Sequence, residues 1–175
     1  NDNDLASWMR KYRNHGMIER DKIEFWGVNM RLQPLQAIVA CHGLKRLSDT
    51  IKKRNENAFI LDKGLRQLQK IVHVPKRLED STETFALYMA LFERRDDLKN
   101  YLLSNDIEVK IHYPIPLHKQ QAAKKDCFFN RAKLKNVEYQ ADRLLTIPVH
   151  QFLNEKHMGW VLEKIFEFYG KKYEH

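Results

Sequence analysis

The chain contains 175 residues, of which 43% are hydrophobic and 31% are charged, and its formal net charge is +8. This composition excludes a disordered tail, and no apolar stretch approaches the roughly 18 residues that a membrane-spanning helix needs. The length predicts one domain or slightly more, with a buried core. The positive charge is compatible with nucleic acid, an anionic membrane, phosphorylated small molecules or simply a basic surface.

Two cysteines, Cys41 and Cys127, are too few and too far apart for a disulfide framework or a zinc site, so no metal is expected. The N-terminal residues are acidic and polar, unlike a secretory signal. We therefore expect a reducing compartment, the cytoplasm. The first residue is not Met and a helical pattern begins by Leu5, so we expect the sequence to start within a longer protein.

The N-terminal part predicts a short helix followed by a loop. Apolar residues at helical spacing indicate a helix over residues 4–13, and an aspartate at position 2 or 4 is placed to cap it. Gly16 follows as a stop signal. Residues 17–32 show no clear period, which predicts a loop.

A much longer helix is predicted over residues 34–68. Pro34 suits its first turn, and apolar residues then recur at spacings of three or four. Gly43 and Gly64 are the points where this helix would bend or split. At 1.5 Å per residue the helix would be about 50 Å long, which suits a strut between domains or a subunit contact.

From residue 71 onward, short strands alternate with helices and predict a small α+β domain. The elements are an extended piece at 71–74, a strand covered on both faces at 84–92, a helix at 95–104, a half-buried strand at 107–111, a helix at 136–144, a short strand at 145–149 and a last helix capped by Asn154.

The first candidate site is a proline-stiffened segment directly after a predicted strand. It carries His112 and His118, with Pro114 and Pro116 between them. Fixed side chains there would lose little entropy on binding, and a histidine can donate to a phosphate or to a sugar hydroxyl. The alternative is a turn whose prolines simply end the strand.

The second candidate site is the pair Asn29 and Arg31, just before the long helix. In an extended backbone, residues two apart point the same way. Arginine suits a bidentate phosphate contact, and asparagine adds a neutral donor. The alternative is a surface loop with a weak ion pair.

Other catalytic motifs are not found: the sequence has no Gly-x-Ser-x-Gly and no Walker-type loop. Cys41 falls on the apolar side of the long helix and is predicted to be inert core. Of Trp8, Trp26 and Trp160, two are predicted to lie in the core.

Several motifs follow one another in an order that is more specific than any of them alone. They are Arg13-Asn14-His15-Gly16, Gly27-Val28-Asn29-Met30-Arg31-Leu32, Leu35-Gln36-Ala37, Leu44-Lys45-Arg46-Leu47 with Arg54, Asp106-Ile107, His112-Tyr113-Pro114 with Pro116-Leu117-His118, and Ile147-Pro148-Val149-His150. This ordered set resembles the C-terminal half of DegT/StrS-family sugar aminotransferases, which depend on pyridoxal 5′-phosphate (PLP).

The resemblance implies an α/β fold, namely the C-terminal portion of the aspartate aminotransferase-like (fold type I) architecture. It divides the chain into the tail of the large PLP-binding domain and a loop at 1–32, a linking helix at 33–70, and a small C-terminal α+β domain at 71–175.

The family transfers an amino group from an amino acid, commonly glutamate, to a keto sugar nucleotide. The resemblance implies a cytoplasmic homodimer with active sites at its interface, and no membrane or nucleic-acid partner. Asn29 matches the loop asparagine that contacts the PLP phosphate of the partner subunit, and Arg31 matches the neighbouring basic residue. The segment of His112, Tyr113 and His118 corresponds to one near the sugar-nucleotide pocket.

Two family segments have no counterpart in this sequence. One carries the Schiff-base lysine, and the other carries the aspartate that pairs with the pyridinium nitrogen. Lys110 is expected to face solvent, so no catalytic residue is assigned and the chain by itself is expected to be inactive. Val28 and Met30, where the family often has an aromatic residue, are expected to be tolerated.

A rival hypothesis belongs to a different class of protein. The chain would be a non-catalytic basic module that binds an acidic partner or RNA, with the long helix as a dimer strut. RNA binding favours stacking aromatics interleaved with basic residues, whereas the aromatics here are scattered.

Overall fold

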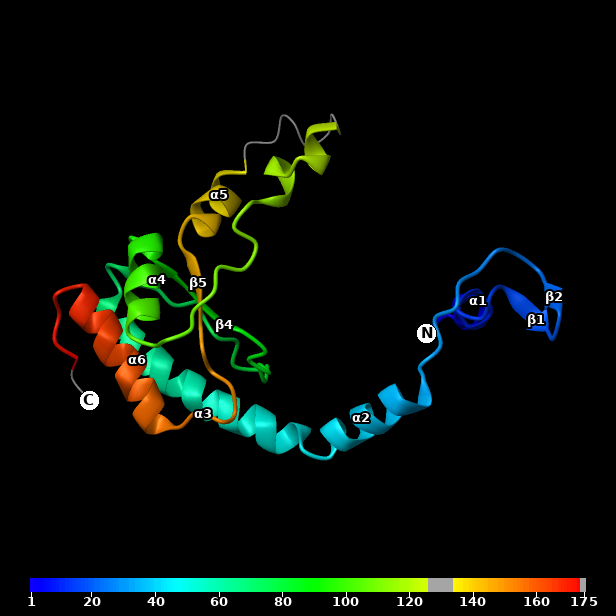
Figure 1. Ribbon diagram of the computed structural model, residues 1–175, viewed down its shortest axis with the longest axis horizontal. Helices are drawn as coiled ribbons and strands as arrows, with labels where there is room; N and C mark the ends of the chain where they lie inside the picture. Colours follow the sequence, from blue (N-terminus) through cyan, green and yellow to red (C-terminus); the bar gives the residue numbers. More distant parts are fainter. Residues whose placement is uncertain (126–133, 174–175) are drawn as a thin grey trace. The chain divides into compact units, whose positions relative to one another are not determined.

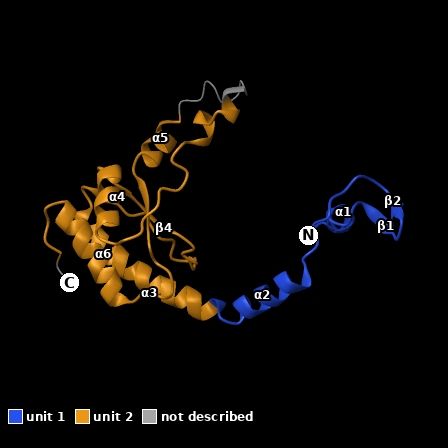
Figure 2. Cartoon of the chain, in the orientation of Figure 1, with its two compact units in different colours: residues 1–47 blue, residues 48–175 orange. Residues whose placement is uncertain are grey.

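The computed structural model describes residues 1–125 and 134–173. The chain divides into two compact units, Asn1–Leu47 (unit 1) and Ser48–His175 (unit 2), which Figure 2 shows in different colours. Each unit is treated by itself below. Among the described residues, no helix has both the length and the apolar character needed to cross a membrane.

Unit 1 begins with α1, Asn3–Tyr12, which confirms the first predicted helix. Of the two aspartates, Asp2 is the cap: its Oδ1 accepts from the backbone N–H of Leu5 at 2.9 Å. The ring of Trp8 stacks between Tyr12 and Phe25, with centroids 4.8 and 5.5 Å away. These stacked rings tie α1 to the segment that follows the hairpin.

A small hairpin follows α1, where the sequence predicted only loop. Its strands are β1, Met17–Glu19, and β2, Lys22–Ile23, paired antiparallel. Asp21 lies in the connecting turn with φ of 66°, a conformation that aspartate tolerates better than most residues. Strands of three and two residues are too short to show a period of two, which is why the pattern was missed.

The helix predicted over 34–68 is split at the first of its two expected points: α2 spans Pro34–Leu44 and α3 spans Leu47–Leu65. A 3₁₀ turn at Arg66–Leu68 follows α3. The break falls just after Gly43, where the N–H of Arg46 bonds the Gly43 carbonyl at 3.1 Å. Gly64 does not split α3.

Glycine at position 64 leaves room for close packing of the helix there. A Cβ on Gly64 would lie 2.6 Å from the side chain of Leu162 on the last helix. The glycine therefore lets α3 approach that helix more closely than an alanine would.

Unit 2 contains an antiparallel sheet in the order β3-β4-β5, with β3 at Val72–His73, β4 at Tyr88–Phe92 and β5 at Leu144–Ile147. Tyr88 pairs with Ile147, and Met89 pairs with Thr146. One face is therefore fully buried and carries Val72, Tyr88, Ala90, Phe92, Leu145 and Ile147. On the opposite face the β4 residues Met89 and Leu91 are only half buried, so cover on both faces is not complete.

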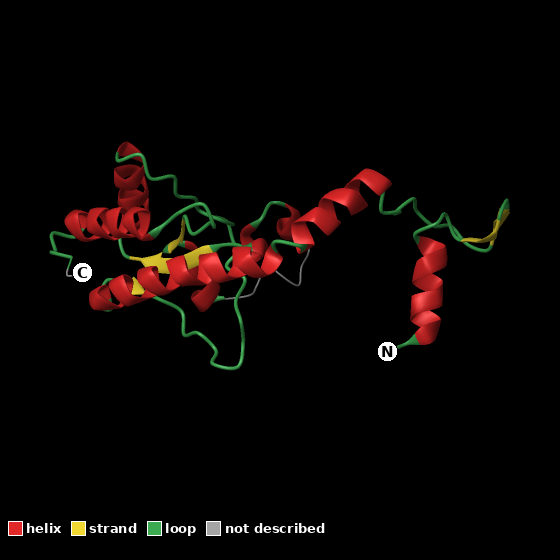
Figure 3. Ribbon diagram, turned by 90° about the horizontal axis from the view of Figure 1, so that it is seen from below, coloured by secondary structure: helices red, strands yellow, loops and turns green. Residues whose placement is uncertain are grey.

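Helices cover the buried face of this sheet (Figures 1 and 3). They include α4 at Arg95–Ser104 and α6 at Glu155–Phe168, which contact each other, together with α3. Asn154 caps α6 as predicted, with its Oδ1 accepting from His157 N at 3.2 Å. A shorter helix, α5 at Lys135–Ala141, precedes β5. Short 3₁₀ turns lie at Leu117–Lys119 and Ala122–Lys125.

The strand predicted at 107–111 is present as an extended segment with one bridge, between Lys110 and Thr146. Its alternation was read correctly, because Ile107 and Val109 are buried while Glu108 and Lys110 are exposed. One bridge is enough to place this segment beside β5.

The core contains one polar cluster. Asp62 on α3 accepts two bonds from the guanidinium of Arg77, each 3.0 Å, and one from the Tyr88 hydroxyl at 2.6 Å. Burial raises the pKa of the Tyr88 hydroxyl, and its bond to Asp62 raises it further. Because Asp62 has three donors, its burial is compensated.

Two expectations about buried side chains are wrong. Cys41 on α2 is exposed, and Trp8, Trp26 and Trp160 are 46%, 88% and 47% exposed, so none lies in the core. The described residues of neither unit fully cover these side chains. Cys127 lies outside the described residues.

Candidate functional site

In unit 1 the predicted pair Asn29 and Arg31 lies on a segment that is bonded backbone to backbone with the end of α1. Residues 12–16 and 27–31 form this clasp. His15 N–H donates to the Val28 carbonyl at 3.0 Å, Val28 N–H to Tyr12 at 2.8 Å, and Met30 N–H to Arg13 at 2.9 Å. Asn14 bridges Asn29. The clasp gives an otherwise irregular loop a fixed backbone.

Two glycines make the close approach possible. Gly16 has φ of +70°, and a Cβ there would lie 1.6 Å from the Phe25 carbonyl oxygen. A Cβ on Gly27 would lie 2.4 Å from Gly16 N and 2.5 Å from the Tyr12 carbonyl oxygen. Neither position accepts a side chain without moving the backbone. The same close approach of two backbone segments therefore explains why both motifs contain a glycine.

Arg31 is oriented by a side chain from the other half of the clasp. Its Nε donates to Asn14 Oδ1 at 2.7 Å, and Arg31 and Asn29 are both exposed. An exposed guanidinium and an exposed amide, two residues apart on a fixed backbone, are a pair of donors suited to a phosphate dianion. The residues therefore fit the phosphate of PLP chemically.

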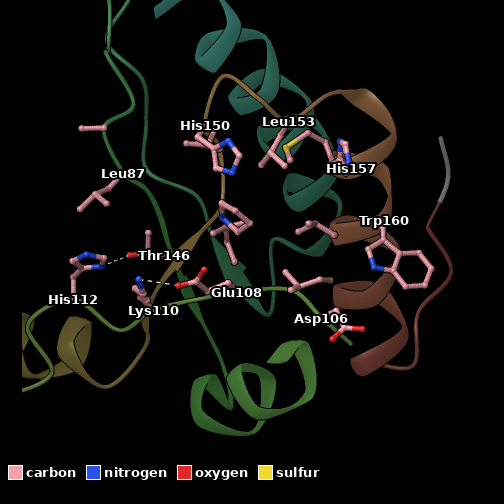
Figure 4. Close-up of a pocket in the computed structure, with 17 residues that line it drawn as sticks. Leu87, Asp106, Glu108, Lys110, His112, Thr146, His150, Leu153, His157 and Trp160 are labelled. Carbon is pink, nitrogen blue, oxygen red and sulfur yellow. Dashed lines mark hydrogen bonds and ion pairs between the residues drawn. The ribbon is translucent and has the colours of Figure 1, made fainter. Parts of the chain in front are cut away.

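Unit 2 contains a groove of about 510 Å³ between the 106–112 segment, the end of β5 and α6 (Figure 4). Its apolar lining includes Val149, Leu153 and Met158. Ionisable side chains also line it: Asp106, Glu108, Lys110, His112, His150 and His157. Apolar walls with a few polar groups are typical of sites for small organic ligands.

His112 lies at one end of this groove, where its ring is bonded to β5. The Nδ1 atom is 2.8 Å from Thr146 Oγ1. Nearby, Lys110 Nζ contacts Glu108 Oε1 at 2.8 Å, and the hydrogen bond from Lys110 lowers the pKa of that carboxylate. The lysine faces solvent, with its side chain 67% exposed, as expected.

The other two predicted residues of this segment lie apart from that bond. Tyr113 is 84% exposed and has φ of 55°, and its ring centroid is 6.4 Å from that of His112. The side chain of His118 is 6% exposed, and its Nε2 is 3.0 Å from Glu138 Oε1 on α5. Neither residue lines the groove.

A helix outside the groove supports one of its walls. Asn57 on α3 is buried, and its Nδ2 donates to the carbonyls of Val149, His150 and Leu153 at 3.4, 3.1 and 3.3 Å. Asn57 on α3 therefore fixes the backbone of the β5–α6 loop through these hydrogen bonds.

The predicted sites omitted three residues that the structure shows making these contacts: Asn14, Asn57 and Thr146. Asn14 stands in a quoted motif, which was the available signal for it. Thr146 is a single polar residue in an apolar stretch, whereas Asn57 follows a run of polar and charged residues, and the partners of both lie at least 34 positions away along the chain. No local pattern could have found them.

The sequence profile of the DegT/DnrJ/EryC1/StrS aminotransferase family matches residues 1–166. This chain belongs to that family. The match confirms the resemblance that the ordered motifs carried, and it spans both units.

Two curated relatives are similar over nearly all of the chain. One is a pleiotropic regulatory protein of Geobacillus stearothermophilus, 28% identical over 97% of this chain and 45% of its own length. Another is the dTDP-3-amino-3,6-dideoxy-alpha-D-galactopyranose transaminase of Aneurinibacillus thermoaerophilus, 27% identical over 94% of this chain and 44% of its own. The chain thus spans less than half the length of these relatives.

Solved structures agree on the fold. DesV of S. venezuelae, in complex with a ketimine intermediate, is 28% identical and superposes with a TM-score of 0.88 over 95% of this chain and 44% of its own. The predicted α/β architecture of PLP-dependent transferases is confirmed. NtdA of Bacillus subtilis, at 21% identity and a TM-score of 0.82, was solved with bound cofactor PMP. The family match and the DesV structure together indicate dependence on PLP, as the resemblance implied.

Proposed function

We propose that this chain is part of an enzyme that transfers an amino group from an amino acid, glutamate, to a keto sugar nucleotide. The observation that carries the proposal is the match of residues 1–166 to a family of aminotransferases. PLP supplies the chemistry by carrying the amino group and acting as an electron sink. The residues of this chain hold and orient the cofactor and the substrate.

Asn29 and Arg31 hold the phosphate of the cofactor. The proposal is supported by the clasp, which fixes their backbone, and by Asn14, which directs the guanidinium of Arg31. As in the family, we propose that the phosphate belongs to the cofactor bound by a partner subunit.

His112 and Tyr113 contact the sugar nucleotide. A half-buried imidazole at the end of a groove, beside an exposed phenol, provides donors for hydroxyl and diphosphate oxygens. His118 belongs to the same proposal. Because its side chain is buried against Glu138, we propose that His118 fixes the 117–119 turn to α5 and does not itself contact the substrate.

The lysine that binds PLP covalently and the second copy of the enzyme lie outside this chain in our proposal. Leu35, Ile38 and Val39 on α2 are 77%, 64% and 72% exposed, and α2 has no buried residue. A helix that is apolar on all sides is normally buried. We propose that α2 is covered in a homodimer whose active sites lie at the interface.

The phosphate assignment is tested in the whole enzyme by replacing Asn29 and Arg31 with alanine, singly and together. We expect the dissociation constant of PLP to rise about tenfold for each change, because each removes a hydrogen bond to a charged group. Arg20→Ala, at an exposed arginine in the hairpin turn, is the matched control. Unchanged PLP retention in the double variant would contradict the assignment.

The division of labour is tested by reducing the PLP-loaded enzyme with borohydride and mapping the modified peptide. We expect the pyridoxyl-lysine outside residues 1–175, and transamination of a keto sugar nucleotide with glutamate as donor. An adduct within residues 1–175 would refute the division. Salt-dependent RNA binding without transaminase activity would favour the basic interaction module instead.

A further inference from the structure

The polar side chain at position 146 is unexpected for its strand. β5 is Leu-Leu-Thr-Ile, and its two neighbours Leu145 and Ile147 are fully buried. Thr146 points to the opposite face, where it is only 8% exposed. Valine has the same shape and an equal preference for strands, so the hydroxyl gives the strand nothing that a methyl would not.

The hydroxyl is explained by what it contacts. Thr146 Oγ1 is 2.8 Å from His112 Nδ1, and the two are drawn joined in Figure 4. Two backbone bonds hold the same place: Thr146 N–H donates to the Lys110 carbonyl at 2.8 Å, and Lys110 N–H donates back at 3.3 Å. His112 follows only two residues after this bridge.

The chain leaves His112 through an uncommon backbone conformation. Tyr113 has φ of 55° and precedes Pro114. A tyrosine in the left-handed region costs about 1 kcal/mol or more, and such residues concentrate at functional sites. His112 is thus fixed by a bridge before it, a turn after it and a side-chain bond at its ring.

We infer that Thr146 is the residue that positions His112, holding the ring through Nδ1 and leaving Nε2 for a ligand. A hydroxyl both donates and accepts, so it holds the ring in the neutral state and in the protonated state. When Thr146 donates to Nδ1, the proton of the neutral ring lies on Nε2, which then donates to a sugar or phosphate oxygen. The inference rests on the proposed function for its ligand, but not for its geometry.

The test compares Thr146→Val with Thr146→Ser in the whole enzyme, with Thr82→Val, at an exposed threonine, as the matched control. The first readout is the ¹⁵N chemical shifts of the His112 ring, which report its tautomer. We expect Thr146→Val to replace a single tautomer by a mixture, and Thr146→Ser and Thr82→Val to leave the shifts as in the wild type. Wild-type ring shifts in a folded Thr146→Val protein would overturn the inference.

The second readout separates this inference from the proposed function. With a keto sugar nucleotide as substrate, we expect Thr146→Val to raise KM about tenfold with a smaller change in kcat, and Thr146→Ser to restore it. If the ring shifts change but KM does not, Thr146 positions His112 and the substrate role of His112 fails. Should Thr146→Val not fold, Thr146→Ala carries the same readouts, and shifts like those of the wild type there would also overturn the inference.

Discussion

The two units of this chain differ in the burial of their apolar side chains. In the described part of the chain, every buried hydrophobic residue belongs to unit 2, between Ala58 and Phe166. In unit 1 the buried residue is Gly16, while Leu35, Ile38 and Val39 of α2 are largely exposed. Burial is therefore decided here by what lies opposite a helix, and not by its sequence.

This contrast has an energetic consequence. Unit 2 draws stability from its own core, at roughly 25 cal/mol for each Å² of apolar surface removed from water. Unit 1 is held by backbone bonds of the clasp and by stacked rings, and its apolar helix gains this term only against another surface. The site residues of unit 1 thus lie on a backbone fixed by hydrogen bonds, whereas those of unit 2 lie over a hydrophobic core.

The largest effect is expected from emptying the core of unit 2. Leu162 is fully buried and packs against Gly64. We expect Leu162→Ala to lower the free energy of unfolding by about 2–5 kcal/mol, because it removes buried methyl groups and leaves a cavity. Urea unfolding followed by circular dichroism measures the change.

The matched change in unit 1 is Leu35→Ala, at a residue that is 77% exposed. In the 175-residue chain we expect it to change stability by less than about 0.5 kcal/mol. In the homodimer we expect it to weaken subunit association. Equal losses for both variants in the 175-residue chain would contradict the contrast between the units.

The next effect comes from the polar cluster inside that core. Burial is the largest single effect on Arg77 and lowers the pKa of its guanidinium, but the hydrogen bond to Asp62 and the charges of Asp62 and Glu83 together raise that pKa above its ordinary value. We expect Arg77→Met to cost about 2–3 kcal/mol, because it leaves the Asp62 carboxylate buried with two hydrogen bonds fewer. Thermal unfolding at neutral pH measures it.

An exposed ion pair provides the comparison. Lys53 and Glu56 on α3 are 3.0 Å apart, with side chains 41% and 48% exposed. Lys53→Met should change stability by less than about 0.5 kcal/mol, since water screens the pair. If Lys53→Met lowers the free energy of unfolding as much as Arg77→Met does, burial is not the reason that the loss of Arg77 is costly for Asp62.

Elements with long, clear periods were predictable from the sequence, and α4, α6 and the caps Asp2 and Asn154 lie where they were expected. The hairpin escaped because strands of two or three residues carry no period. The break after Leu44 was predicted only as one of two possible points, at Gly43 or at Gly64, because the apolar spacing continues across both. In both places, the local backbone geometry determines the structure, and the spacing of apolar residues does not reveal that geometry.

The site divides along the same line. The sequence predicts that Asn29 and Arg31 lie on one side of one segment, because residues two apart in an extended backbone point the same way. It gave no sign that Thr146 would meet His112, because that contact depends on the bridge between Lys110 and Thr146. Pairing across the fold is information that a single sequence does not contain.

A smaller effect is expected within unit 1, at the turn that lets the clasp close. Gly16→Ala places a Cβ where φ is +70° and the Phe25 carbonyl lies in the way. We expect a local loss of about 1–2 kcal/mol, because an exposed hairpin can shift to relieve part of the clash. PLP retention by the whole enzyme should fall with it, measured by absorbance after dialysis.

Gly43→Ala is the control, since nothing lies within 4 Å of a Cβ there. Alanine should stabilise α2 by about 0.5–1 kcal/mol, from helix propensity. If Gly16→Ala retains PLP as well as Gly43→Ala does, the clasp does not set the phosphate site.

The smallest effect concerns Glu138, which holds the buried side of His118 in unit 2. Hydrogen bonds from Lys119 first, and then from His118, lower the pKa of Glu138 below its ordinary value of 4.5. A carboxylate with a lowered folded pKa contributes stability above its unfolded pKa and loses it as the pH falls through the folded value. The wild type should therefore lose more stability below pH 4.5 than Glu138→Gln does.

Urea midpoints of both proteins, compared between neutral pH and the acid side of 4.5, measure this difference. Glu79→Gln, at an exposed position, removes the same charge and should follow the wild type. Because Glu138 lies at the surface, salt should shrink the difference, whereas salt should hardly change the cost of Arg77→Met. If salt does not shrink the Glu138 effect, α5 and the His118 turn are buried more deeply than the rest of the surface of unit 2. The difference between the buried core and the exposed surface of unit 2 would then not hold at Glu138.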